Sequence, residues 1–235
     1  MRRMTAPDWA PAPLSEVVGL FSPLTTPWWI AGGHAIELAV GRPLRPHADI
    51  DVLVLRAHQH AVQRALPGWE WWAADPPGRL RPWQPGEYLR LGVHDVWCRP
   101  GPDGPWRIQV MLDESHEDLW VSRRCALVHR PLAELGTVTA DGVPYLAPEV
   151  QLFYKAREPR PKDEEDFTAV LPLLRPAQRA WLVKAIREAY GPPPRSPRDG
   201  GRERVVHGPP HPWTARLTGG PSGAADPIGV VRPRC

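Results

Sequence analysis

Residues 28–55 read WWIAGGHAIELAVGRPLRPHADIDVLVL, and they carry the strongest structural signal in the chain. A glycine pair, Gly32 and Gly33, is followed after a gap of fifteen residues by Asp49 and Asp51. Side chains alternate between the two faces of a β-strand, so a strand through this region puts both aspartates on one face. Two neighbouring carboxylates repel each other unless a cation lies between them, and their hard oxygens suit Mg²⁺, which commonly bridges carboxylates to phosphates. The stretch therefore predicts an enzyme that acts on a nucleoside triphosphate.

The charge of the chain is unevenly distributed. The 235 residues carry a net charge of +3. The excess lies in residues 191–235, which hold seven arginines and three acidic residues, whereas residues 1–190 hold 22 basic and 23 acidic side chains. A near-neutral body without a basic stripe disfavours nucleic acid as a partner.

The sequence also bears on the compartment. Its first residues lack the apolar core of a signal peptide, and no stretch approaches the ~18 apolar residues of a membrane-spanning helix. Cys98, Cys125 and Cys235 are widely spaced and form no CxxC pattern. These features predict a cytoplasmic protein without a membrane partner.

Hydrophobic periodicity and turn residues divide the chain into three parts. The first part predicts an α/β arrangement, the middle part mostly strands, and the part after Pro148 mostly helices. The predicted helices are 14–21, 34–40, 57–66, 148–157, 162–173 and 176–190, and the predicted strands are 28–31, 49–55, 70–72, 88–93, 95–99, 106–112 and 119–123.

These elements predict an α/β (α+β) fold, with a small mixed β-sheet and a C-terminal helical subdomain. The predicted boundaries are a catalytic domain over 1–145, a helical subdomain over 146–190 and a tail over 191–235. The tail is rich in proline, glycine and arginine and has little apolar periodicity, so it is predicted to be disordered.

Residues 28–51 resemble the DNA polymerase β-type nucleotidyltransferase superfamily. The run Trp-Ile-Ala-Gly-Gly-x-Ala-Ile over 29–36, the fifteen-residue gap and Arg-x-His-x-Asp-Ile-Asp over 45–51 are most similar to aminoglycoside 2''-nucleotidyltransferases (adenylyltransferases). The strong similarity covers about 25 residues, and a weaker one extends to about residue 190.

The resemblance implies a reaction and a set of site residues. Asp49 and Asp51 would hold two Mg²⁺ ions, and Gly32 and Gly33 would let backbone N–H groups approach a triphosphate. The enzyme would move a nucleoside monophosphate, with AMP from ATP favoured, to a hydroxyl of a small molecule, with an aminoglycoside-like antibiotic favoured. The further residues expected to bind the nucleotide are Arg45, His47 and Lys155.

Sites of this superfamily usually contain a third carboxylate on a neighbouring strand, which serves as a metal ligand and general base. The candidate strand is 106–112 with the residues that follow it. Alternation puts Gln109, Met111 and Asp113 on one face and favours Asp113 over Glu114 as the third carboxylate. Alignment of the middle of the strand instead puts Gln109 at that position, and glutamine cannot accept a proton at neutral pH. Asp113, Glu114 and the absence of a third carboxylate all remain open at this stage.

Two alternative functions follow from the same residues. One is nucleotide transfer to a protein or an RNA, as occurs elsewhere in the superfamily. The other is a non-catalytic nucleotide-binding or antitoxin-like module, which Gln109 would favour if it replaces the third carboxylate.

Overall fold

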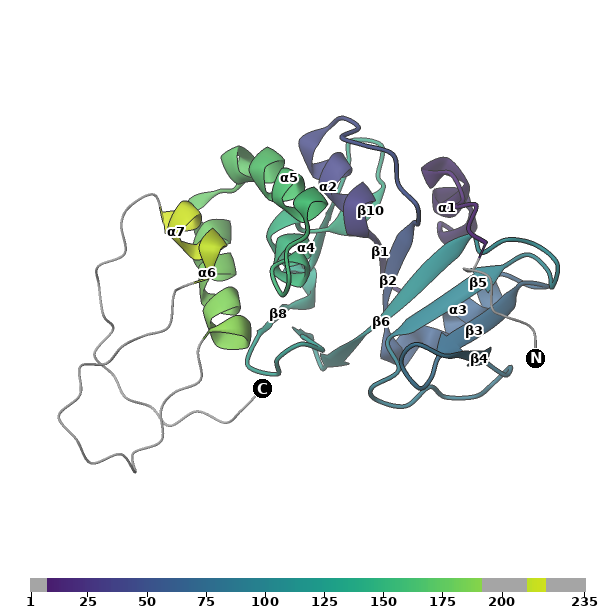
Figure 1. Cartoon of the computed structure of the whole chain (residues 1–235). Helices are drawn as coiled ribbons and strands as arrows, with labels where there is room; N and C mark the ends of the chain where they lie inside the picture. The colour runs from purple at the N-terminus through teal and green to yellow at the C-terminus, as the bar shows by residue number, and fades with distance from the viewer. Residues whose placement is uncertain (1–7, 192–210, 219–235) are drawn as a thin grey trace, which may run out of the picture.

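The computed structural model describes residues 8–191 and 211–218 (Figure 1). Its strands are β1 (Trp28–Ala31), β2 (Asp51–Leu55), β3 (Glu70–Ala74), β4 (Leu80–Pro82), β5 (Asp95–Arg99), β6 (Ile108–His116), β7 (Leu119–Val121), β8 (His129–Pro131), β9 (Gly136–Val138) and β10 (Pro144–Leu146). Its α-helices are α1 (Leu14–Phe21), α2 (Gly32–Val40), α3 (Gln59–Ala65), α4 (Pro148–Lys155), α5 (Pro161–Val170), α6 (Pro176–Tyr190) and α7 (Pro212–Thr218).

Within the described residues, the ten strands form one mixed sheet. Its main path is β4-β3-β5-β6-β2-β1-β10-β9, with β7 paired to β6 and β8 to β7. The pairs β2–β6 and β1–β10 are parallel and the others antiparallel. The mixed sheet and the C-terminal helices confirm the predicted α/β (α+β) fold class.

Helices cover the two faces of the sheet, and each face has its own apolar core. Val52 and Val54 of β2 pack in a cluster with residues of α1 and α3. Leu53 and Leu55 point to the other face and pack in a cluster that includes residues of α2, α4, α5, α6 and α7. Alternation along β2 therefore puts Asp51 on the face of α2 and α4.

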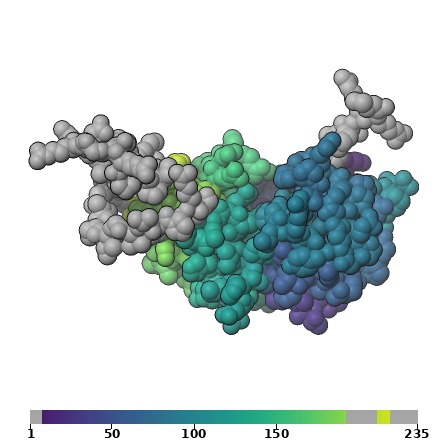
Figure 2. Space-filling view, turned by 90° about the horizontal axis from the view of Figure 1, so that it is seen from below, coloured from purple at the N-terminus to yellow at the C-terminus, as the bar shows by residue number. Residues whose placement is uncertain are grey.

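The two ends of the molecule differ in content. In the space-filling view, the blue segment that carries β3 to β5 lies at one end and the green C-terminal helices lie at the other (Figure 2). None of the helices in the described part of the chain is long and apolar enough to cross a membrane.

Several predicted elements differ from the structure in their bounds or their type. β2 begins at Asp51, so Asp49 lies just before the strand and not in it. Residues 88–93 were predicted as a strand but form a loop, because the side chain of Gln59 binds the backbone that a neighbouring strand would have paired. Its Oε1 accepts the N–H of Leu89 at 2.8 Å. The predicted helix 57–66 begins as a short 3₁₀ turn, Arg56–His58, before α3.

The predicted disorder of 191–235 is wrong for residues 212–218, which form α7. Trp213 in this helix is fully buried and stacks on Phe167 of α5, with ring centroids 4.4 Å apart. Its indole N–H also donates to Oε1 of Glu164 at 2.6 Å. Tertiary packing therefore orders a segment whose local composition favours disorder; residues 192–210 and 219–235 lie outside the described residues.

We expect Trp213→Ala to lower the free energy of unfolding by about 3–5 kcal/mol, because it removes a large buried ring and its stacking on Phe167. Urea unfolding followed by circular dichroism measures the change. Ala215→Gln, at an exposed position of the same helix, is the control, with an expected change within about 0.5 kcal/mol. Equal stability of Trp213→Ala and wild type would contradict the packing of α7.

Candidate active site

The candidate site begins where β1 ends and α2 starts. Ala31 pairs with Asp51 across β1 and β2, so Gly32 follows directly beside that aspartate. Gly32 has a φ of +65°, and a Cβ atom placed on it would lie 2.2 Å from Oδ2 of Asp51. Both the left-handed backbone and the contact with Asp51 require glycine. The backbone N–H of Gly32 donates to Oε1 of Gln151 in α4 at 2.8 Å, which ties the turn to the helical layer.

Asp51 carries an electrostatic signature of a cation site. Burial raises its pKa to about 7, and the carboxylates of Asp49 and Asp95 add to the effect. Lys155 and Arg123 oppose the shift. Without a cation the two carboxylates repel each other. A divalent ion that prefers oxygen ligands therefore fits the two aspartates.

Gly33 is covered by the loop that leads to the aspartates. A Cβ atom on Gly33 would lie 2.3 Å from Cε1 of His47 and 3.2 Å from a guanidinium nitrogen of Arg45. The loop that leads to the aspartates therefore lies against the glycine turn, and the contact of Arg45 and His47 with a nucleotide stays a prediction.

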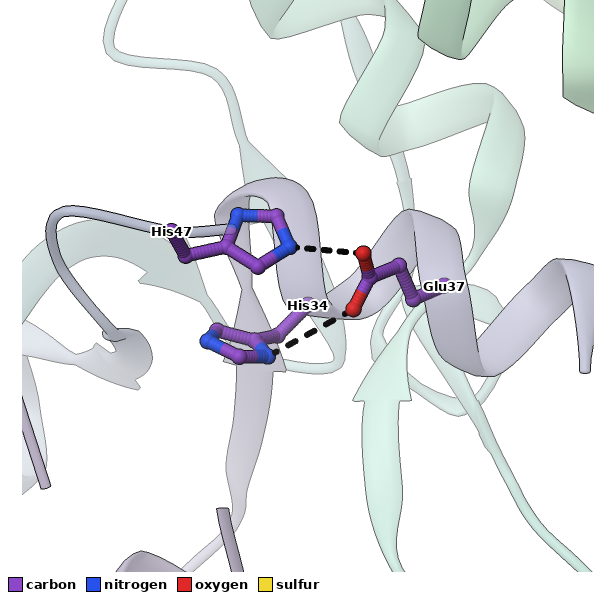
Figure 3. A group of neighbouring side chains, drawn as sticks. All are labelled: His34, Glu37 and His47. Atoms are coloured by element: carbon purple, nitrogen blue, oxygen red, sulfur yellow. Dashed lines mark ion pairs between the residues drawn. The ribbon is translucent and has the colours of Figure 1, made fainter. Parts of the chain in front are cut away.

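Glu37 clamps the same loop onto α2. Its Oε1 accepts hydrogen bonds from the backbone N–H groups of Leu44 at 2.7 Å and Arg45 at 3.2 Å. Figure 3 shows the same carboxylate beside His47, whose Nε2 lies 2.8 Å from Oε1. Burial opposes ionisation, but these hydrogen bonds hold the pKa of Glu37 below its usual value. The ring of His34 lies against that of His47, with centroids 4.2 Å apart. His47 therefore positions the loop, and a contact with nucleotide remains a prediction.

We expect Gly33→Ala to displace His47 and with it the loop that carries Asp49. A misplacement of about 1 Å costs on the order of 100-fold in rate, so kcat/KM for the nucleotide should fall by that order. Steady-state kinetics of nucleotide turnover measure it. Gly19→Ala in α1 is the matched control, since a Cβ there meets nothing within 4 Å. Wild-type kinetics in Gly33→Ala would contradict the placement of the loop.

A network of ion pairs joins the loop to α4 and α5. Arg45 donates two hydrogen bonds to Asp166, one of them at 2.9 Å. Nζ of Lys155 lies 2.9 Å from Asp166 and 3.1 Å from Asp163. Arg160 also pairs with Asp163, and the charge of Asp49 contributes to its raised pKa. The network thus holds three cations against two carboxylates.

The ion pairs of this network bear on which basic residues are available to bind phosphate. Lys155 was predicted to contact phosphate, but its ammonium already pairs with two carboxylates. Arg160 was not singled out in the sequence, yet its side chain is 62 % exposed, and its charge interacts with that of Asp49. Among the cations of this network, Arg160 is the one with an exposed head near the aspartates.

The structure does not bring Asp113 to the aspartate pair. Gln109 is the β6 residue opposite Asp51, whereas Asp113 is opposite Leu55, about 13 Å further along the strand. Asp113 is fully buried, accepts a hydrogen bond from the indole of Trp120 at 2.7 Å and another from the hydroxyl of Tyr154. Arg123 lies 3.6 Å from its other oxygen. Asp113 therefore accepts hydrogen bonds from buried donors of β7 and α4.

Glu114 pairs with an arginine and not with a group of the candidate site. Its Oε1 accepts a hydrogen bond from Nε of Arg56 at 2.7 Å, and Arg56 is itself buried. The carboxylate that lies near the site is Asp95 on β5, which accepts a hydrogen bond from Nε2 of Gln109 at 3.3 Å. The sequence predicts a strand at 95–99, but only the order of strands in the sheet reveals that its first residue lies by the site.

A mixed sheet with Asp51 at the start of β2 and Asp49 just before it, beside a glycine turn at the N-terminus of a helix, is the arrangement expected of a nucleotidyltransferase. The sequence profile of the aminoglycoside-2''-adenylyltransferase family matches residues 13–170. The chain belongs to this family and is an antibiotic-modifying nucleotidyltransferase.

Solved structures with a related fold were also found, whereas the comparison with curated proteins finds no match. ANT(2'')-Ia in complex with adenylyl-2''-tobramycin is 18% identical over 73% of this chain and 94% of its own, with a TM-score of 0.48. The lincosamide antibiotic adenylyltransferase LnuA, with lincomycin bound, is 15% identical over 70% of this chain and 100% of its own, with a TM-score of 0.49. A nucleotidyltransferase-like protein from Paracoccidioides brasiliensis is 15% identical over 74% of this chain and 85% of its own, with a TM-score of 0.40.

Proposed function

We propose that the protein transfers AMP from ATP to a hydroxyl of an aminoglycoside-like antibiotic, in a reaction that requires Mg²⁺ at Asp49 and Asp51. The dependence on ATP favours the cytoplasm as its location. The observation that carries the proposal is Asp51 packed against Gly32, with Asp49 two residues before it, in a chain that the adenylyltransferase family profile matches.

The residues present fit a divalent metal. Asp49 and Asp51 offer hard carboxylate oxygens, and their mutual repulsion contributes to the raised pKa of Asp51. Two Mg²⁺ ions held there would polarise the α-phosphate and neutralise charge on the entering and leaving oxygens.

The side of the site toward β1 suits the triphosphate. The first turn of α2 has N–H groups without partners inside the helix, and its positive dipole end favours phosphate. The exposed guanidinium of Arg160 adds positive charge near Asp49. Arg45 and Lys155 fix α5 and α4 around this side through their ion pairs with Asp166.

A non-catalytic nucleotide-binding module is the second candidate, because Gln109 and not a carboxylate lies opposite Asp51. Such a module would bind ATP with the same residues and transfer nothing. Transfer to RNA has less support, because residues 1–190 are nearly neutral.

Mass spectrometry of reaction products separates these candidates. The protein is incubated with Mg²⁺, each of the four nucleoside triphosphates, and a panel of aminoglycosides and lincosamides. We expect an aminoglycoside to gain one AMP, only with ATP. ATP binding without a modified acceptor would favour the second candidate, and product formed on a lincosamide alone would overturn the aminoglycoside assignment.

A further inference from the structure

The first step of the inference is the position opposite Asp51. The register of β2 and β6 pairs Asp51 with Gln109, and the next strand continues the row with Trp97 of β5. Gln109 can orient a group but cannot take a proton at neutral pH. A base for the acceptor hydroxyl must therefore come from another residue on this face of the sheet.

Asp95 meets the geometric requirement. It pairs with Met111, which in turn pairs with Leu53, so Asp95 shares the face of Asp51 one pleat repeat further along. Its Oδ1 accepts hydrogen bonds from Nε2 of Gln109 at 3.3 Å and from Arg123 at 3.4 Å. Gln109 is the residue opposite Asp51, and it also holds Asp95 through this hydrogen bond.

Asp95 is also accessible, unlike the carboxylate predicted from the sequence. Its side chain is 42% exposed, whereas that of Asp113 is fully buried. The charged group that the structure pairs with Asp95 is the guanidinium of Arg123, 3.4 Å from its Oδ1.

The order of the strands places Asp95 on the side from which an acceptor must come. The sheet runs β5-β6-β2-β1, and the N-terminus of α2 follows β1. A triphosphate at that N-terminus leaves its pyrophosphate on the β1 side of Asp51. In-line displacement requires the attacking oxygen on the opposite side, which is the side of β6 and β5.

We infer that Asp95 is the general base of this enzyme and that Gln109 is the residue that positions it. This rests on the proposed function. The acceptor oxygen forms a bond to the α-phosphorus of ATP, and the bond from that phosphorus to the leaving pyrophosphate oxygen breaks. The hydroxyl proton passes to the Asp95 carboxylate and from there to solvent. The enzyme thus keeps three carboxylates, with the third on β5 in place of β6.

The test compares Asp95→Asn, Gln109→Leu and the control Glu70→Gln. Glu70 lies on β3, is 33% exposed and pairs with Arg99, so it resembles Asp95 in setting but lies further from Asp51. A general base contributes about 100- to 10,000-fold, so kcat of Asp95→Asn should fall within that range. KM for the acceptor and the Kd for ATP, from calorimetry, should change less than about threefold, because the base acts in the transition state. Glu70→Gln should keep wild-type kcat.

The role of Gln109 is tested with measurements that separate the catalytic rate from the stability of the fold. Gln109→Leu should lower kcat and leave the melting temperature and ATP affinity unchanged, whereas Gln109→Asn, which keeps an amide donor, should recover part of the rate.

Each other outcome has a distinct meaning. Wild-type kcat in Asp95→Asn would overturn the inference and leave the proposed function intact. A raised acceptor KM at unchanged kcat would make Asp95 an ammonium-binding group, which also overturns it. Wild-type protein without product on any acceptor would instead defeat the proposed function.

Discussion

Asp51→Asn should abolish nucleotide transfer while it stabilises the metal-free protein at alkaline pH. The loss of rate should be about a thousand-fold or more, since metal-bound oxygens provide several kcal/mol of transition-state stabilisation. Asparagine keeps the shape of the side chain beside Gly32 but removes the charge that attracts a cation. Pyrophosphate release measures the rate, and Asp118→Asn in an exposed turn is the control.

The gain in stability follows from the direction of the pKa shift. The pKa of Asp51 rises from 3.8 to about 7 on folding. Between these values the folded protein holds a proton that the unfolded chain has released, so stability falls as pH rises through this window. A shift of this size corresponds to about 4 kcal/mol at most. We therefore expect the melting temperature of Asp51→Asn to exceed that of wild type at pH 8, and this difference to disappear at pH 3.5.

Mg²⁺ should stabilise the wild-type protein at alkaline pH, as the substitution of Asp51 does. Bound cation favours the ionised carboxylate, so Mg²⁺ should raise the melting temperature of wild type at pH 8 and have a much smaller effect on Asp51→Asn. A variant that keeps a tenth of the wild-type rate, or that responds to Mg²⁺ as wild type does, would contradict the metal assignment.

Asp113→Ala should have the opposite profile, with a large loss of stability and little loss of catalytic rate in the folded protein. The substitution leaves the Arg123 guanidinium, which is 8% exposed, without its carboxylate. It also removes the acceptor for the Tyr154 hydroxyl and the Trp120 indole. Loss of one partner from a buried ion pair costs about 3–5 kcal/mol.

For a domain of this size, that cost lowers the melting temperature by on the order of 10 °C. Thermal unfolding followed by circular dichroism measures it, and kcat is measured well below the transition. Asp113→Asn retains the size of the side chain and one acceptor oxygen, so it should be milder. An Asp113→Asn protein with the wild-type melting temperature but a hundred-fold lower kcat would contradict this account and indicate a catalytic role for Asp113.

The local signals in the sequence predicted the part of the fold that carries Asp49 and Asp51, the pair proposed to bind the metal. β1, the glycine turn, α2 and β2 follow from apolar runs, glycines and alternation within a few residues. The short strands β4, β8, β9 and β10 were missed because three residues carry little periodicity, and all of these strands except β9 also contain a proline. Helix α7 was missed because its order depends on the burial of Trp213 against another helix.

The third carboxylate shows why a site is harder to predict than a fold. Alternation correctly groups Gln109, Met111 and Asp113 on one face of β6. Which of them meets Asp51 depends on the register of β6 against β2, and that register is set by contacts between segments far apart in sequence. Asp95 approaches only because β5 lies beside β6 in the sheet. No local pattern contains that information.

The ratio of pyrophosphate released to AMP attached to the acceptor tests the central claim most directly. Purified protein is incubated with ATP, Mg²⁺ and an aminoglycoside, and both products are quantified in parallel for wild type and Asp49→Asn. The account predicts a one-to-one ratio in wild type, no product without Mg²⁺ and almost none in Asp49→Asn. Release of ADP with a phosphorylated acceptor, or full transfer by Asp49→Asn, would contradict it.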